Sequence, residues 1–399
     1  MINRELRDYY GCIKQSLLNF FKSQSSIGIV LIMATLLALL LANSTLAEVY
    51  HGFLDIPVVI SINEFEIAKP LLLWVNDGLM AIFFFMIGLE VKRELLEGRL
   101  QDLSKVVVPT VGAVGGMLVP ALIYIWFNVN DAVAIQGWAI PMATDVAFAL
   151  GILSLLGKRV SIEMKLFLLT LAIIDDLGSI VVIALYFGES VAPIALGISS
   201  FFILVLVLMN WRGVTNNMVY VLIGIIIWAA VLKSGVHATI AGVIVGLLIP
   251  LRNNKKSFYE LENSLYVPVN YVILPLFAFV NTGISFSGVD SKNLFDNVTM
   301  GIALGLFLGK QVGIFSFAAL AIKLSAKKSP DNMSWAQLYG ISILGGVGFT
   351  MSLFIGSLAF ECSGDACINM VDERIGILIG SLCSGIVGYL LLKRTLPNP

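Results

Sequence analysis

The sequence predicts an all-α polytopic membrane protein with about twelve transmembrane helices and one short external β-hairpin. Of the 399 residues, 58% are hydrophobic and only 13% are charged, against about 45–50% and about 25% in soluble domains. Apolar runs close to the roughly 20 residues that cross a bilayer repeat along the chain. No polar stretch is long enough to form a soluble domain, so residues 1–399 are expected to form a single transmembrane domain.

Each apolar run between charged or turn-forming residues is assigned one span. The first run follows a basic leader, as the core of a signal peptide would, but the leader contains Glu5 and Asp8 and no clean A-x-A-like site follows. A retained first span is therefore favoured. The predicted spans are 24–42, 71–97, 105–128, 133–155, 162–187, 194–212, 217–230, 235–248, 257–281, 300–321, 337–360 and 370–393.

The placement of basic residues predicts the orientation of the chain. Most of the 25 Lys and Arg residues fall in the N-terminal segment, in alternate connections on its side and at the C-terminus. Short cytoplasmic connections are enriched in Lys and Arg, which places both termini in the cytoplasm. A net charge of −1 gives no support for nucleic-acid binding. The opposite connections hold only Lys69, Lys233, Lys292 and Arg374.

The largest external segment, residues 43–70, carries the pattern of a short hairpin. Apolar residues alternate from Ile56 to Ile62, stop at residues 63–64, and resume at Phe65 and Ile67, which is typical of two paired strands. A two-stranded hairpin is marginally stable alone. We therefore expect it to lean on another body, for which a second copy of the chain is a candidate.

Cysteine usage does not indicate a disulfide framework. Cys12 and Cys383 are isolated, whereas Cys362 and Cys367 share one short polar connection. If that connection faces an oxidising compartment, the two thiols would be able to pair, and this pairing is a hypothesis.

Four ionisable residues lie at the centres of predicted spans. Asp175 and Asp176 are at the centre of 162–187, Asp145 is at the centre of 133–155, and Lys310 is at the centre of 300–321. Charged groups near the bilayer midplane are costly and mark function by default. A structural alternative is one Asp–Lys pair that locks two helices, but three acids against one base leave acids over.

Adjacent residues on a helix diverge by about 100°, so Asp175 and Asp176 cannot face the same way. One is able to meet Lys310 while the other faces a cavity, and such groups titrate as a coupled set. A carboxylate in that position can exchange a proton for a small hard cation, because hard cations prefer oxygen ligands. The pattern therefore predicts a proton-coupled cation site.

Two spans carry signals for breaks at membrane depth. Pro141 lacks a backbone donor and clashes with the preceding turn of a helix, and the stretch GGVG at 345–348 favours unwinding. Irregular backbone at this depth is tolerated where it is buried in protein or lines a cavity. Broken helices leave positive and negative half-helix ends there, which Asp145 and Lys310 respectively would compensate. The alternative is two kinked helices packed closely through glycine.

Six stretches together closely resemble the NhaA family of bacterial sodium/proton antiporters over nearly the whole chain. They are GLEVKRE at 88–94, ATDVAF at 143–148, IDDLG at 174–178, VHATIAG at 236–242, GKQVG at 309–313 and GGVGFTM at 345–351.

The resemblance implies a fold and a site. Spans 105–187 and 300–393 would form two inverted three-helix repeats whose broken helices cross at mid-membrane, an arrangement described for this family. Na⁺ or Li⁺ and the protons would bind at Asp175 and Asp176. Lys310 would pair with Asp175, and Thr144 and Asp145 would belong to the crossing.

The resemblance also implies regulation by pH. Positions associated with it are Glu90, Arg93, Glu94, Glu262, Asp77 and His237. The Glu90–Glu94 charges could equally set topology at a helix end, and His237 could serve a hydrogen-bonded interface near an outer span end. The hairpin resembles the dimer contact of the family, so the expected partners are Na⁺, Li⁺, H⁺, membrane lipid and a second copy.

The expected function is secondary active, electrogenic antiport by alternating access in the bacterial inner membrane. No cofactor is expected, and the chain has no G-x-x-x-x-G-K-[ST] nucleotide loop. An intramembrane aspartyl protease would carry its two aspartates on separate helices, whereas Asp175 and Asp176 are adjacent in this sequence, which argues against that class. A zinc protease of the H-E-x-x-H type is excluded because His51 and His237 are the only histidines.

Two transport alternatives remain open. A cation channel selected by carboxylates is possible in principle, although a buried Lys310 and broken crossing helices favour a carrier. The closer rival is a sodium symporter for an organic solute. The distinguishing observation is whether Na⁺ flux requires counter-moving protons or an organic co-substrate.

Overall fold

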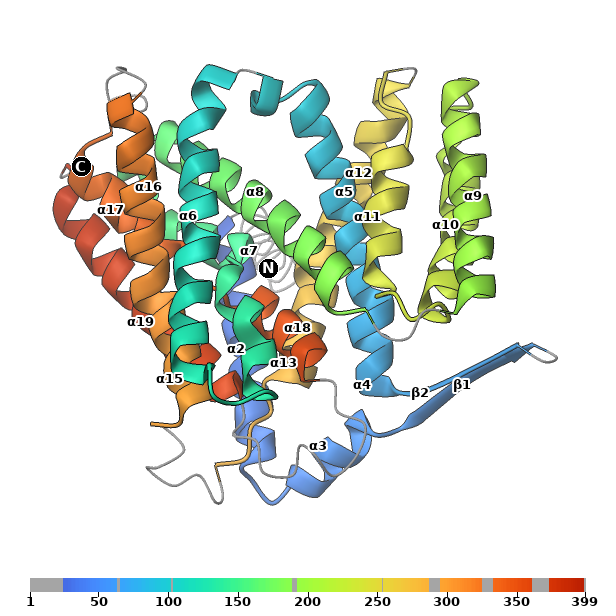
Figure 1. The fold of residues 1–399 in the computed structure, drawn as a ribbon, viewed down its shortest axis with the longest axis horizontal. Helices are drawn as coiled ribbons and strands as arrows, with labels where there is room; N and C mark the ends of the chain where they lie inside the picture. Colours follow the sequence, from blue (N-terminus) through green and yellow to red (C-terminus); the bar gives the residue numbers. More distant parts are fainter. Residues whose placement is uncertain are drawn as a thin grey trace, which may run out of the picture.

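The computed structural model is a bundle of helices with one two-stranded sheet projecting from it (Figure 1). It describes residues 24–62, 65–101, 103–188, 192–252, 254–286, 295–324, 333–360 and 373–397. Within these ranges, eight helices are long and apolar enough to cross a membrane, and two bent pairs raise the count to ten if each is one span. The prediction of a polytopic helical membrane protein is confirmed.

Three of the eight long helices contain a π-helical turn. Leu71–Leu96 consists of α4 (Leu71–Leu73), the turn Trp74–Leu79 and α5 (Met80–Leu96); Lys255–Asn281 consists of α12 (Lys255–Pro268), the turn Val269–Ile273 and α13 (Leu274–Asn281); Asn297–Leu324 consists of α15 (Asn297–Leu304), the turn Gly305–Gly309 and α16 (Lys310–Leu324). The other five are α2 (Gln24–Ala42), α6 (Leu103–Asn128), α8 (Ile162–Tyr186), α9 (Pro193–Trp211) and α19 (Glu373–Thr395). Short 3₁₀ turns lie at Arg99–Gln101, after α5, and at Gly157–Arg159.

The two predicted breaks are confirmed. A 3₁₀ helix (Ala134–Met142) meets α7 (Val146–Ser154) at 41°, and α17 (Trp335–Leu344) meets α18 (Phe349–Ala359) at 43°. Pro141 lies inside the 3₁₀ helix, and the chain bends just after it.

The two remaining predicted spans correspond to shorter apolar helices, α10 (Asn217–Leu232) and α11 (Thr239–Leu248). Helix α11 begins four residues after the predicted start at 235, because Gly235 adopts a left-handed φ of 80° that ends the preceding turn. By length and composition the structure therefore supports eight to ten spans, fewer than the predicted twelve.

The predicted hairpin is confirmed. Strands β1 (Pro57–Ile62) and β2 (Phe65–Pro70) pair antiparallel, with Val59 opposite Ala68 and Ile60 opposite Ile67. A helix that the sequence did not predict, α3 (Ala47–Leu54), precedes it. The predicted pair Cys362 and Cys367 falls outside the described residues.

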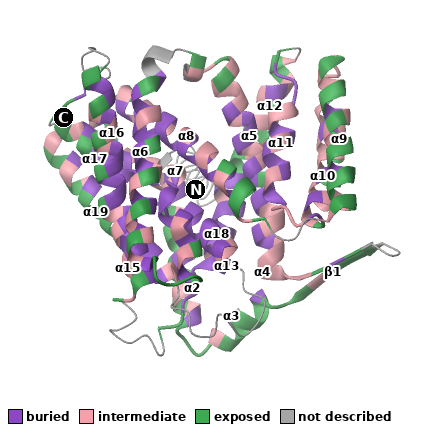
Figure 2. Cartoon of the chain, in the orientation of Figure 1, coloured by how far each residue is buried: buried purple, intermediate pink, exposed green. Residues whose placement is uncertain are grey.

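Buried residues concentrate in the middle of the molecule, where α7, α8, α13 and α18 lie, whereas α9 at the edge is largely exposed (Figure 2). Helix α16 packs closely on α6, because a Cβ on Gly313 would collide with the carbonyl oxygen of Gly115. Small residues allow membrane helices to approach in this way. The approach fixes the start of α16, where Lys310 lies, in the buried centre.

Candidate ion-binding site

The two broken helices meet at their breaks. The hydroxyl of Thr144 donates a hydrogen bond of 2.8 Å to the carbonyl oxygen of Gly345, and the backbone N–H of Asp145 donates one of 2.7 Å to Val347. Residues about 200 positions apart in the chain are thus joined at one point. Each break leaves backbone N–H and C=O groups without a helical hydrogen bond. Hydrogen bonds across the crossing satisfy such groups, as burial in the membrane requires.

The carboxylate of Asp145 caps two half-helices at once. One oxygen accepts from the backbone N–H of Phe148 at 2.9 Å, in the first turn of α7. The other accepts from the N–H of Thr350 at 3.1 Å and from its hydroxyl at 2.5 Å, in the first turn of α18. A negative charge is favourable at a helix N-terminus, and here one carboxylate serves two. Both Asp145 oxygens are therefore engaged.

Lys310 and Asp175 form a buried ion pair. The ammonium nitrogen lies 2.5 Å from Oδ2 of Asp175, and both side chains are 0% exposed. The ammonium also donates to the Thr144 hydroxyl at 2.9 Å, which links it to the C-terminal end of α17 at Gly345. The π-helical turn Gly305–Gly309 comes directly before Lys310, and such turns are frequent at functional sites.

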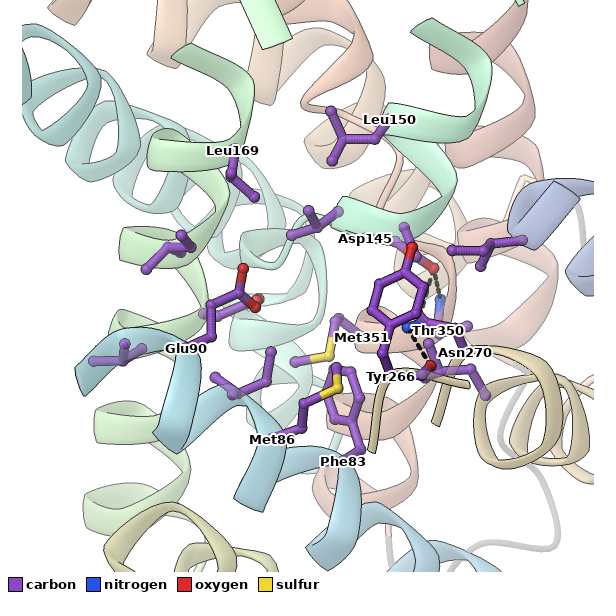
Figure 3. A pocket seen from close by; sticks show the side chains of 18 of the residues that line it. Phe83, Met86, Glu90, Asp145, Leu150, Leu169, Tyr266, Asn270, Thr350 and Met351 are labelled. Carbon is purple, nitrogen blue, oxygen red and sulfur yellow. Dashed lines mark hydrogen bonds between the residues drawn. The ribbon is translucent and has the colours of Figure 1, made fainter. Parts of the chain in front are cut away.

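Asp176 faces a different way from its neighbour. It is 2% exposed, its Oδ1 has no hydrogen-bond partner, and it lines a cavity of about 390 Å³. Asp145 and Thr350 line the same cavity, on the opposite wall from Glu90 in the close view (Figure 3). A buried carboxylate oxygen without a partner is costly, so this atom is available for a proton or a cation.

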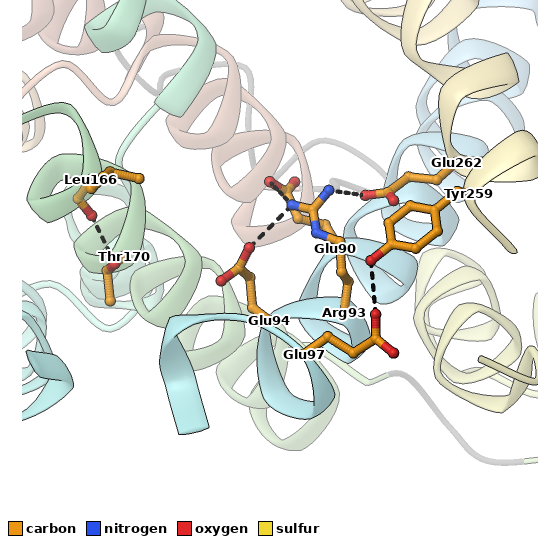
Figure 4. Close-up of polar contacts among 8 residues, drawn as sticks. All are labelled: Glu90, Arg93, Glu94, Glu97, Leu166, Thr170, Tyr259 and Glu262. Atoms are coloured by element: carbon orange, nitrogen blue, oxygen red, sulfur yellow. Dashed lines mark hydrogen bonds and ion pairs between the residues drawn. The ribbon is translucent and has the colours of Figure 1, made fainter. Parts of the chain in front are cut away.

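An ion-pair network lines the other end of the cavity (Figure 4). The guanidinium of Arg93 contacts Glu262 at 2.6 Å, Glu94 at 3.2 Å and Glu90 at 3.7 Å. Three carboxylates surround one positive charge, and the set joins α5 to α12. The cavity runs from this network to Asp176.

The structure does not bring the other two expected pH-linked residues to this network. Asp77 pairs with Lys69 at 2.6 Å, beside the base of the hairpin. The imidazole of His237 contacts the carbonyl oxygen of Phe187 at the end of α8. Both lie toward the hairpin end of the bundle, and Asp77 is about 20 Å along its helix from Glu90 at 1.5 Å per residue.

Comparison with known proteins places the chain in a family. A family model described as Na⁺/H⁺ antiporter 1 matches residues 18–392. The chain belongs to the Na⁺/H⁺ antiporter 1 family. It is therefore a multi-pass membrane protein of a transporter family.

Curated members of this family match nearly the full length. The Na⁺/H⁺ antiporter NhaA of Proteus mirabilis (strain HI4320) is 52% identical over 381 residues, covering 95% of this chain and 97% of the relative. NhaA of Yersinia pestis bv. Antiqua (strain Angola) is 53% identical over 380 residues, covering 95% and 96%. NhaA of Serratia proteamaculans (strain 568) is 52% identical over 382 residues, covering 95% and 98%. The resemblance inferred from the six stretches is confirmed.

In this Na⁺/H⁺ antiporter 1 chain, three polar residues of the site were not singled out from the sequence. Thr350 bonds Asp145, and Tyr266 and Asn270 line the cavity. Thr350 lies within the glycine-rich stretch that marks the break. Asn270 lies in the π-helical turn Val269–Ile273 just after Pro268. A polar residue near a proline inside an apolar span was the available signal.

Proposed function

We propose that this protein exchanges Na⁺, or Li⁺, for protons at a single buried site by alternating access. The observation that carries the proposal is the carboxylate of Asp176, which lies at the inner end of the cavity with one oxygen unpartnered. The family membership and the name shared by the relatives support Na⁺ and H⁺ as the exchanged ions.

Competition at Asp176 would couple the two ions. An isolated charge in a low-dielectric interior is strongly disfavoured, so the carboxylate must hold either a proton or a cation before the site changes its access. A cation entering the cavity displaces the proton, and a proton arriving from the other side displaces the cation. A site that holds neither ion, and so carries an uncompensated charge, would change its access too rarely to dissipate the ion gradients.

The ion pair of Asp175 with Lys310 would govern how much charge moves. If cation binding near Asp176 releases more than one proton, each cycle moves net charge, and the membrane potential contributes about 2.3 kcal/mol per charge per 100 mV. Two adjacent aspartates, of which only Asp175 pairs with the buried ammonium, support this electrogenic exchange, because a second proton can be held within the same site.

Alternating access is supported by the one-sided cavity. The cavity reaches Asp176 from the network around Arg93, whereas toward the hairpin the ring of Phe354 packs on Phe84 and Phe277, with centroids 5.3 and 6.3 Å apart.

We propose that α10 and α11 complete twelve spans and that 105–187 and 300–393 are inverted repeats. We also propose that the protein lies in a bacterial inner membrane with both termini in the cytoplasm.

The hairpin is proposed as a dimer contact. It projects away from the helical bundle (Figure 1), and Val59 and Ile60 are 52% and 46% exposed. Its base is anchored, because the indole of Trp74 donates to the Val58 carbonyl at 3.0 Å. Apolar strand residues that remain exposed are suited to pairing with a second copy.

The network around Arg93 supports pH regulation, and the variant Glu262→Gln tests it. With Glu262 neutral, the Arg93 guanidinium faces two carboxylates, Glu90 and Glu94, instead of three, and the negative charge at this end of the cavity falls by one. Exchange is then expected to begin at a pH lower by about 1 unit, since one unit corresponds to about 1.4 kcal/mol of interaction. The measurement is exchange rate against pH in vesicles, and an unchanged profile would remove Glu262 from regulation.

Glu97→Gln is the matched control. Hydrogen bonds from the Lys255 ammonium and the Tyr259 hydroxyl hold the pKa of Glu97 below its usual range. A carboxylate with a lowered pKa keeps its contacts above the ordinary carboxyl range and loses them only as pH falls through the lowered pKa. Glu97 is therefore ionised throughout the neutral range, and its variant is expected to leave the pH profile unchanged.

The experiment that tests the proposed function uses purified protein in vesicles carrying a proton gradient and a pH-sensitive dye. Addition of Na⁺ or Li⁺ is expected to dissipate the gradient, and K⁺ is expected to have no effect. Dissipation by K⁺ alone would contradict the selectivity. Na⁺ flux that depends on an organic solute and not on protons would establish the symporter instead.

A further inference from the structure

In the described parts of the chain, seven buried side-chain polar atoms lack a hydrogen-bond partner. Three of them belong to one five-residue stretch of α8, residues 175–179. They are Oδ1 of Asp175, Oδ1 of Asp176 and Oγ of Ser179, and Ser179 is 1% exposed. Buried polar atoms without partners are rare in proteins and call for an explanation. Two of the three belong to the proposed ion site, and the third is unassigned.

Helix geometry places Ser179 beside the two aspartates. At 100° and 1.5 Å per residue, its Cα is rotated about 40° from that of Asp175 and about 60° from that of Asp176, and it lies about 6 Å and about 4.5 Å further along the axis. Ser179 therefore projects between them, one turn on. On the same face of α8, the apolar Ala172 precedes the aspartates and the apolar Ile183 follows Ser179. Ser179 is therefore the next side chain after the aspartates on this face that offers an oxygen atom.

The hydroxyl of Ser179 is not used by its own helix. A buried Ser or Thr in a helix commonly donates to the carbonyl four residues earlier. Thr170 of the same helix does so to Leu166 at 2.7 Å (Figure 4), and Ser342 of α17 does so to Leu338 at 2.8 Å. Ser179 is more deeply buried than Thr170 and makes no such bond.

Ser179 lies further along α8 than the residues of that helix that line the cavity. The α8 residues that line it are Leu169, Ile173 and Asp176, all earlier in the helix. The later end of α8 points toward the hairpin, because Phe187 contacts His237 in the connection where Lys233 bonds the backbone of the hairpin at Glu66. Ser179 is thus on the hairpin side of the aspartate pair.

We propose that Oγ of Ser179 is a further oxygen ligand for the dehydrated cation, used when the site opens toward the hairpin. The inference rests on the proposed function and adds a ligand to it. A neutral hydroxyl has no proton to give up near neutral pH. Ser179 therefore raises cation affinity from the hairpin side without changing the number of protons exchanged.

The test compares Ser179→Ala with the unaltered protein in membrane vesicles of both orientations. With Na⁺ or Li⁺ supplied on the hairpin face, the apparent KM is expected to rise about 5- to 10-fold, as the loss of one ligand of ordinary hydrogen-bond strength implies. The maximal rate and the KM on the cavity face are expected to change by less than about 2-fold by the same reasoning.

Matched variants separate a ligand from a packing role. Ser179→Thr keeps the hydroxyl and is expected to keep the KM, whereas Ser179→Cys keeps the volume but offers sulfur, which suits hard cations poorly, and is expected to behave like Ser179→Ala. Thr170→Val removes a hydroxyl from the opposite side of α8, about 180° away, and is expected to leave both KM values unchanged.

An unchanged KM on the hairpin face in exchanging Ser179→Ala and Ser179→Cys proteins would overturn the inference, as would an equal rise on both faces. Absence of Na⁺-dependent proton movement in the unaltered protein would instead refute the proposed function. The two failures are therefore distinguishable in one set of vesicles.

Discussion

Asp176→Asn is expected to abolish Na⁺- and Li⁺-driven proton exchange while the protein still inserts and folds. Asparagine keeps the shape of the side chain but neither ionises nor offers a charged ligand at the end of the cavity. Loss of interactions with one charged group, up to about 3 kcal/mol, corresponds to about a 100-fold loss of affinity, and loss of the exchangeable proton removes the coupling altogether. Exchange in vesicles is the measurement, and near-normal activity would overturn the site assignment.

Asp131→Asn is the control for that experiment. Asp131 is an exposed carboxylate in the connection before the first half-helix, and hydrogen bonds from the backbone N–H groups of Ala134 and Val133 hold its pKa below its usual range. It makes the same change from carboxylate to amide, away from the cavity. Its variant is expected to exchange normally, so an equal loss in both variants would indicate a general effect of removing acid groups.

Lys310→Gln is expected to destabilise the protein strongly. The ammonium is the charged partner of Asp175, and both groups are fully buried. Removing one member of a buried ion pair leaves an uncompensated charge and costs about 3–5 kcal/mol. The measurement is the Tm of the purified protein in detergent, which is expected to fall well below that of the unaltered protein.

The double variant Asp175→Asn with Lys310→Gln tests the cause. If the loss of stability comes from an unpaired charge, neutralising Asp175 recovers much of it, and the effects are strongly non-additive. Exchange is expected to stay impaired, because Asp175 is part of the proposed site. A double variant as unstable as the sum of the single variants would show that Lys310 acts through packing alone.

Depth in the membrane predicted that four ionisable side chains lie at one level, whereas the pairing of Lys310 with Asp175 was implied by the resemblance to the NhaA family. Asp145, Asp175 and Lys310 lie at the centres of their spans, and the structure gathers them at the crossing. Helical divergence of adjacent residues also predicted that Asp175 and Asp176 would face different ways. What these residues do in transport stays a prediction that the variants above address.

Contacts that depend on the relative placement of two backbones were not predictable from one sequence. Asp145 was expected to compensate positive half-helix ends, but the sequence did not indicate that one oxygen would cap α7 and the other α18. That requires the first turn of α18 to lie against a residue some 200 positions earlier. The π-helical turns before Lys310 and around Asn270 were not predicted either, because hydrophobic periodicity does not reveal a local change in the hydrogen bonding of a helix.

The measurement that tests the central claim most directly is proton release on cation binding. Purified protein in weakly buffered detergent solution is titrated with Na⁺, Li⁺ or K⁺ while the pH is recorded. Competition at Asp176 predicts that Na⁺ and Li⁺ release protons, that K⁺ does not, and that Asp176→Asn removes the response. Binding of Na⁺ without any release of protons would contradict a shared site for the two ions.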